Sequence, residues 1–152
     1  MEDRFDILRR IRLEFGSEIT SVTRIDISEG KFSHIVSTVF SDCLEAFETP
    51  RLSTTCCARV IETGRPFMIA DMSRTNGDVC CPMMTAEGIA AYMGVPLFTG
   101  GYAAGALEVF ARKPREWRDD EVDTLERYAR IFETLLDDQR VGKKVSLLRQ
   151  VR

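Results

Sequence analysis

The chain has 152 residues and a mass of 17.2 kDa, and a chain of this size buries about two-thirds of its unfolded surface, which is enough for one domain with its own core. Hydrophobic residues make up 44% and charged residues 30%, proportions that exclude disordered and collagen-like chains. The net charge of -3 argues against a protein that neutralises nucleic-acid phosphates, so we expect no nucleic-acid partner.

The N-terminus and the cysteines indicate the cellular compartment in which the protein is expected. The N-terminus, Met-Glu-Asp-Arg, is charged, and no apolar run approaches the ~20 residues of a membrane-spanning helix. Five cysteines occur, an odd number whose two adjacent pairs lack the C-x-x-C spacing of structural zinc sites. We therefore expect a cytoplasmic protein with mostly reduced thiols, no metal site and no membrane partner.

The first third of the chain predicts a helix followed by a β-hairpin. Between Glu2 and Phe15 apolar residues recur every three or four positions, and Gly16 ends this helix. From Glu18 to Ile27 the pattern alternates instead, and a second strand, rich in β-branched residues, runs from Lys31 to Val39 after a Glu-Gly turn.

The middle of the chain predicts a short helix, a strand and a long loop. Ser53 or Thr54 caps a helix that stops at Gly64, and a strand from Phe67 to Asp71 follows. Residues Met72 to Met84 have no clear period, so we expect a long loop there.

The last third predicts a hairpin and the longest helix. Strands from Ile89 to Phe98 and from Tyr102 to Arg112 flank a Thr-Gly-Gly turn, and a helix with an acidic first turn follows Pro114. The order of elements favours an α+β fold, with a central antiparallel sheet of five or six strands and helices mainly on one face. The inner stripe of the last helix is expected to be Val122, Leu125, Ala129, Phe132 and Leu136.

Four motifs together resemble the GAF domain family in their order and spacing. They are Cys57 to Asp71 with its Gly-Arg-Pro, Ala91 to Leu97 with its Gly-Val-Pro, Gly105 to Val109, and Pro114 to Trp117. The resemblance spans about Ile7 to Leu136. It implies a stand-alone, GAF/PAS-like sensory or regulatory module that binds a small molecule or senses redox state, rather than an enzyme.

By this resemblance, a ligand pocket lies on the helix-poor face of the sheet. The strand that ends at Asp71, the loop with Cys80 and Cys81, and the strand through Tyr92 meet there in GAF domains. The ligand and any cofactor remain open. The expected ligand-binding residues are Ile69, Asp71, Cys81, Met84, Ile89, Tyr92 and Val95.

Two alternative functions rest on the loop cysteines. Free methionine-(R)-sulfoxide reductase is a GAF enzyme of similar length that uses loop cysteines, so Cys80 and Cys81 are candidate redox thiols. Cys81 also precedes Gly88 with a spacing that looks like the bilin-attachment cysteine of photoreceptor GAF domains, although its neighbours are Cys80 and Pro82 rather than a histidine. The single histidine, His34, is expected to be a surface or packing residue of a strand.

The terminal helices suggest how such a module signals. We expect residues 1–138 to form the GAF domain and residues 139–152 to form a basic helical extension without acidic residues. The apolar positions of the terminal helices exceed what one face of a sheet needs, which predicts a homodimer and a signalling partner protein. These positions are Phe5, Leu8, Ile11, Phe15, Phe132, Leu135, Leu136, Val145 and Leu148.

Overall fold

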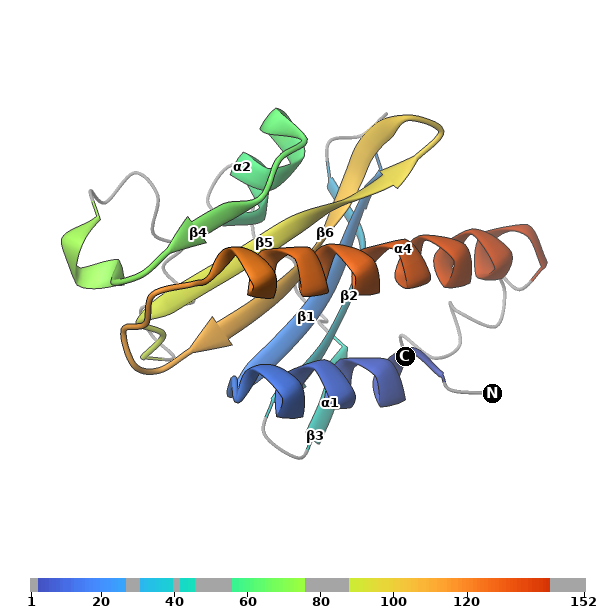
Figure 1. Cartoon of the computed structure of the whole chain (residues 1–152). Helices are drawn as coiled ribbons and strands as arrows, with labels where there is room; N and C mark the ends of the chain where they lie inside the picture. The colour runs from blue at the N-terminus through green and yellow to red at the C-terminus, as the bar shows by residue number, and fades with distance from the viewer. Residues whose placement is uncertain (1–2, 27–30, 40–41, 46–55, 76–87, 143–152) are drawn as a thin grey trace.

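The computed structural model describes residues 3–26, 31–39, 42–45, 56–75 and 88–142, with side chains for 3–24, 56–75 and 88–135 (Figure 1). In chain order the elements are α1 (Arg4–Phe15), β1 (Ile19–Asp26), β2 (Lys31–Val39), β3 (Asp42–Glu45), α2 (Cys56–Thr63), β4 (Phe67–Ile69), the 3-10 helix η2 (Met72–Arg74), β5 (Ala91–Thr99), β6 (Tyr102–Ala111) and α4 (Asp119–Gly142). No helix in these described ranges is long and apolar enough to cross a bilayer.

The strands form one six-stranded sheet in the order β3-β2-β1-β6-β5-β4. All neighbouring strands run antiparallel, so the predicted α+β class with an antiparallel sheet is confirmed. Helices α1 and α4 lie against one face, whereas α2 packs on the other face against β5 and β6 (Figure 1). We call these two sides the α1/α4 face and the α2 face.

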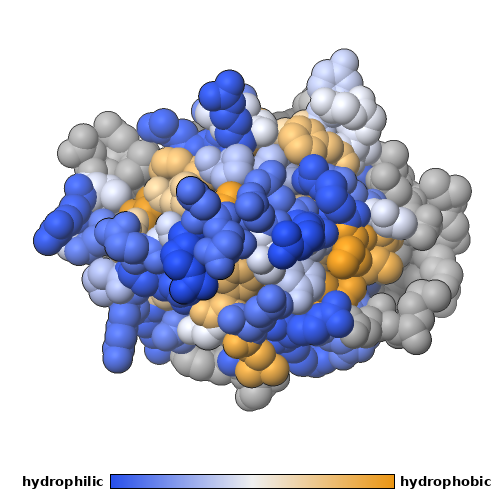
Figure 2. Space-filling model, viewed as in Figure 1, coloured by the Kyte–Doolittle hydropathy of each residue, from blue (hydrophilic) through white to orange (hydrophobic). Residues whose placement is uncertain are grey.

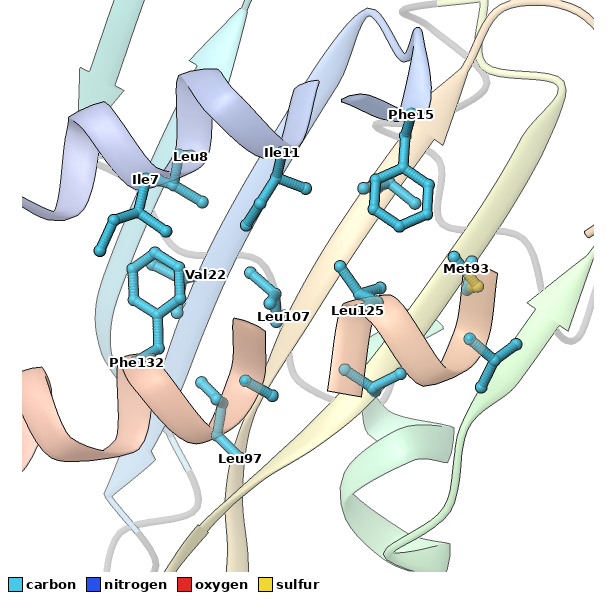
Figure 3. Packing of buried hydrophobic residues seen from close by; sticks show 14 residues of the cluster. Ile7, Leu8, Ile11, Phe15, Val22, Met93, Leu97, Leu107, Leu125 and Phe132 are labelled. Atoms are coloured by element: carbon cyan, nitrogen blue, oxygen red, sulfur yellow. The ribbon is translucent and has the colours of Figure 1, made fainter. Parts of the chain in front are cut away.

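The main hydrophobic core lies between the sheet and the pair α1 and α4 (Figure 3). Alternate residues of β5 and β6 point into it, because successive side chains of a strand project to opposite faces. Each fully buried Leu or Phe there contributes about 1.5–3 kcal/mol to folding. The cluster consists of Ile7, Leu8, Ile11, Phe15, Val22, Met93, Val95, Leu97, Leu107, Val109, Val122, Leu125, Ala129 and Phe132.

This core corrects one premise of the homodimer prediction. Leu8, Ile11 and Phe132 have no exposed surface, and Phe15 is 6% exposed, so the apolar stripes of both helices are used to cover the sheet. Leu136, Val145 and Leu148 lie outside the described side chains. Phe5 and Leu135 are partly buried against the same core, so the described parts of these stripes keep little of the surplus apolar area on which the prediction rested.

Local sequence signals explain the ends of α1. The side chain of Asp3 accepts a hydrogen bond from the backbone of Asp6, and the Asp6 side chain accepts one from Asp3 in return, so the first turn is capped at both positions. Gly16 adopts a left-handed φ of 61° and ends the helix, as predicted.

The strand after α2 is shorter than predicted. Gly64 ends α2 with a φ of 65°, and β4 then covers only three residues. The expected strand end at Asp71 is wrong, because the Asp71 side chain accepts hydrogen bonds from the backbone and the hydroxyl of Ser73 and so caps η2. This 3-10 turn also shortens the predicted loop from its N-terminal end.

The start of α4 is tied to two distant elements. Arg115 donates hydrogen bonds to the backbone oxygen of Phe15 and to the carboxylate of Glu121, and its guanidinium stacks on Trp117. Trp117 in turn donates to the backbone oxygen of Ile69. From this anchor α4 runs without a break to Gly142, so the predicted boundary between residues 138 and 139 falls inside a continuous helix.

Candidate functional site

A group of polar residues lies within the apolar cluster of the α2 face. The register pairs Ser21 of β1 with Glu108 of β6, and Glu108 with Gly94 of β5, so these three positions form a row across the sheet. Helix α2 covers this face. The apolar cluster around the row contains Cys56, Cys57, Val60, Ile69, Ile89, Tyr92, Ala106 and Phe110.

The centre of this site is a hydrogen bond between two buried ionisable side chains. The hydroxyl of Tyr92 donates to Oε2 of Glu108 over 2.6 Å, while Glu108 is 3% exposed and Tyr92 is 0% exposed. Burial raises the pKa of Glu108 from 4.5 to about 7, and the hydrogen bond from Tyr92 partly opposes that rise. Near neutral pH this carboxyl therefore changes its charge readily.

Burial and the neighbouring carboxyl also shift the pKa of the Tyr92 phenol. Its pKa lies well above 10, first because the ring is buried and then because the charge of Glu108 opposes a second negative charge. Tyr92 is therefore a neutral hydrogen-bond donor at physiological pH. Its ring packs edge-on against Phe110 with 5.3 Å between the ring centroids, which fixes the hydroxyl over the carboxyl.

Gly94 makes room for this hydrogen bond. A Cβ atom at position 94 would collide with the hydroxyl of Tyr92 and would lie 3.1 Å from a methyl group of Val60 on α2. The Tyr92 ring therefore lies along β5 in the space that Gly94 leaves, and its hydroxyl reaches the residue opposite Gly94 on β6, which is Glu108. The glycine of the Gly-Val-Pro motif thus has a specific task on the α2 face.

No cation compensates Glu108 within the described part of the chain. The carboxyl forms no ion pair there, and the only interaction that opposes the rise of its pKa is the Tyr92 hydrogen bond. A buried carboxylate without a positive partner is costly, and such groups concentrate at functional sites. The arrangement can accept a proton, or it can accept a hydrogen bond from a positively charged or strongly donating group.

Two thiols border the same site. Cys56 and Cys57 lie at the start of α2, are 1% and 2% exposed, and form no disulfide. Both are near enough to Tyr92 for their charges to oppose its ionisation. Both belong to the apolar cluster of the α2 face, where they pack as small core residues. Among the described residues no group of three His, Cys, Asp or Glu side chains could hold a metal ion.

The structure brings together only some of the predicted ligand-binding residues. Ile69, Ile89 and Tyr92 belong to the cluster on the α2 face. Asp71 is partly exposed and serves as the cap of η2. The placement of Val95 on this face is wrong, because it is three residues beyond Tyr92 and strand alternation puts it in the core under α4.

Three of the predicted residues lie outside the described range, and one important residue was missed. Cys80, Cys81 and Met84 fall in the segment 76–87, which the structure does not describe. Glu108 appeared in the sequence only as part of a fold motif. Its signal was a single acidic residue inside an otherwise apolar strand, since β6 is buried from Ala104 to Ala111.

Comparison with known proteins identifies the family. The sequence profile of the GAF domain matches residues 6–136. The chain belongs to the GAF family. No match to a curated protein is found.

Solved structures with several functions share this GAF fold. A segment of a methyl-accepting chemotaxis protein, residues 122 to 287, superposes with a TM-score of 0.72 at 18% identity, covering 91% of this chain and 88% of the other. Free methionine-R-sulfoxide reductase from Neisseria meningitidis, in complex with its substrate, gives 0.68 at 14% identity, with coverage of 90% and 78%. The photoproduct state of a Synechocystis GAF3 domain gives 0.66 at 17% identity, with coverage of 96% and 94%. At these identities the likeness establishes the fold alone.

Proposed function

We propose that this GAF domain is a sensory or regulatory module that binds a small molecule at the α2 face and passes its occupancy to the helices on the opposite face. The observation that carries the proposal is the buried pair of Tyr92 and Glu108. The family supplies the general role, since GAF domains are sensory and regulatory modules.

The pair favours a functional role because it costs folding free energy. A carboxyl that is 3% exposed loses its hydration, and one neutral hydrogen bond replaces only part of it. An apolar residue at position 108 would continue the apolar pattern of β6 without that cost. A ligand that carries an ammonium group or a strong hydrogen-bond donor would relieve it.

The direct test is native mass spectrometry of freshly purified protein together with its absorption spectrum. We expect a copurified small molecule in the wild type that is lost, or bound at least about tenfold more weakly, in Glu108→Gln, because the charged acceptor is removed. Glu126→Gln is the matched control, since Glu126 lies on α4 and makes no hydrogen bond or ion pair within the described residues. Equal retention of the molecule in both variants would remove Glu108 from the site.

The absorption spectrum and an activity assay separate the two alternatives. A visible absorption band that survives denaturation would indicate a bilin linked to Cys81. Turnover of free methionine sulfoxide with a dithiol reductant, abolished by replacing Cys80 and Cys81 with serine, would indicate a thiol enzyme. Either result would replace the proposal of a noncovalent binding module.

For output we propose a homodimer formed through the terminal helices. Two exposed apolar side chains support it: Leu13 of α1 is 71% exposed and Ile131 of α4 is 44% exposed. Helices α1 and α4 pack beside each other on the same face, and Tyr128 of α4 donates a hydrogen bond to Glu14 of α1. A second copy that pairs with these helices would respond to a change in their relative position.

A further inference from the structure

Strand β5 has an edge that no other strand covers in the described parts of the sheet. Strand β4 pairs only with Tyr92, Met93 and Gly94, so residues 95–99 extend beyond it. Pro96 fits this position, because an edge residue whose N–H would face away from the sheet loses no ladder hydrogen bond when it is proline. The backbone groups of this edge still need partners.

Helix α4 supplies those partners from one turn of its length. Arg130 donates from Nη2 to the backbone oxygen of Pro96 over 2.9 Å, and the backbone N–H of Phe98 donates to Oε1 of Glu133 over 2.9 Å. Arg130 and Glu133 also form an ion pair through Nη2 and Oε1 at 2.9 Å, and the guanidinium lies 5.2 Å from the centre of the Phe98 ring. We call this ring of contacts the β5–α4 clasp.

The clasp and the polar site share one strand. Tyr92, Gly94 and Pro96 follow each other at every second position of β5, and an irregularity in register between Leu97 and Phe98 then interrupts the alternation. Since a strand rises about 3.3 Å per residue, the carbonyl that Arg130 holds lies only about 7 Å along the chain from the glycine under the Tyr92 ring. Gly94 therefore lies two residues from the backbone oxygen that Arg130 binds.

One residue of the clasp is largely buried. The side chain of Glu133 is only 17% exposed, and it accepts one hydrogen bond, from the backbone N–H of Phe98, beside its ion pair with Arg130. After Glu133, α4 continues to Gly142. Leu135, two residues beyond Glu133, still packs against the main core, so the clasp lies within the part of α4 that covers the sheet.

Resting on the proposed function, we propose that the β5–α4 clasp couples the α2-face site to the C-terminal half of α4. When the Tyr92 hydroxyl is hydrogen-bonded to Glu108, the edge of β5 lies where Arg130 and Glu133 can bind the backbone of Pro96 and Phe98. When this hydrogen bond is broken, β5 shifts at Pro96 and Phe98, the clasp weakens, and α4 beyond Arg130 becomes freer to move.

Amide hydrogen exchange tests this coupling without any ligand. Tyr92→Phe breaks the hydrogen bond at the site, and Glu133→Gln breaks the charged contact of the clasp. We expect each single variant to raise exchange at the amides of residues 130–142 by about tenfold, the effect of losing a hydrogen bond to a charged group. In the double variant Tyr92→Phe adds no further increase, because its effect passes through the clasp.

Two controls make the result decisive. Glu126→Gln removes the same charge two turns earlier on α4 and should leave exchange at residues 130–142 unchanged. Helix α1 is the internal reference for general loosening, since it packs on the same face and its hydrogen bond to α4 comes from Tyr128 rather than from a clasp residue. Exchange that rises equally in α1 and α4, or effects that add fully in the double variant, would overturn the coupling.

The outcome is independent of ligand binding. If Tyr92→Phe changes exchange only in β5 and α2, the coupling is wrong, and the small-molecule site can still be established by mass spectrometry. If α4 responds as expected while no small molecule is found, the coupling stands and the proposed ligand is refuted.

Discussion

The hydroxyl of Tyr92 and the carboxyl of Glu108 are joined by a 2.6 Å hydrogen bond in the interior of the α2 face. Each residue belongs to a different central strand, and Gly94 between them provides the space for the phenol ring. Because this carboxyl is buried without a described cation, its protonation and the stability of the fold are linked. Three of the following predictions depend on this pair.

Glu108 should make the domain less stable as the pH rises toward 7. Its pKa is about 7 in the folded chain and 4.5 as an ordinary value, so the folded chain keeps a proton that the unfolded chain has released. The stabilisation from this proton is complete below pH 4.5 and is lost as the pH rises to about 7, on the order of 3 kcal/mol in total. Urea unfolding at several pH values should show this loss in the wild type and a much flatter profile in Glu108→Gln; parallel profiles would contradict it.

Tyr92→Phe should destabilise the domain by about 1–3 kcal/mol at neutral pH, because Glu108 loses its only described donor while remaining buried. Without that donor the pKa of Glu108 should rise further, since the hydrogen bond lowers it. Chemical denaturation measures the first effect and its pH dependence the second. Tyr102→Phe removes a hydroxyl at a side chain that is 70% exposed and should leave stability unchanged.

Gly94→Ala should cost about 1–3 kcal/mol of stability through overpacking. The new methyl group meets the Tyr92 hydroxyl first, then Cζ of the same ring and then Val60, so the ring has to leave its place over the strand. Thermal unfolding should show a smaller cost of this substitution in a Tyr92→Phe background, where the nearest clashing atom is absent. An equal cost in both backgrounds would mean that Tyr92 does not occupy this space.

The dimer proposal predicts a specific sensitivity at Ile131. Light scattering at tens of micromolar protein should show a dimer for the wild type and a monomer for Ile131→Asp, because a charge on an exposed apolar residue of α4 opposes pairing of the helices. Met68→Asp is the matched control, since Met68 is 42% exposed but lies on β4. A wild-type monomer, or equal dissociation by both variants, would refute pairing through α4.

Several elements were predictable because their signals are local. The period of α1, its glycine end and the hairpin of β1 and β2 all depend on neighbouring residues, and each agrees with the structure. The GAF motifs then supplied the order of the remaining elements.

The candidate site was harder to predict because it depends on contacts across the sheet. Tyr92 and Glu108 meet only because β5 and β6 pair in one register. Val95 was assigned to the wrong face because the face of a strand residue can be assigned only when one residue of that strand is known to point inward. The clasp joins Phe98 of β5 to Glu133 of α4, which are 35 residues apart, and no local pattern in either element marks these positions. The predicted positions Cys81 and Met84 remain predictions.

The molecular surface exposes little of the apolar stripes of α1 and α4. On the face shown in Figure 2, hydrophilic residues cover most of the area and hydrophobic ones form small separate patches. An interface through α1 and α4 therefore depends on a few side chains such as Leu13 and Ile131 rather than on a broad apolar surface.

The pairing of β1 with β6 in the middle of the sheet has a consequence for biosynthesis. Thr23 of β1 donates to the backbone oxygen of Ala106 of β6, 83 residues later in the chain. A nascent chain that emerges from the ribosome with β1 and β2 already formed must wait for β6 before the sheet can close, because these non-local contacts need both strands. Until then the inner edge of β1 is open, so slow translation between residues 24 and 105 would prolong a state that is prone to edge-to-edge aggregation.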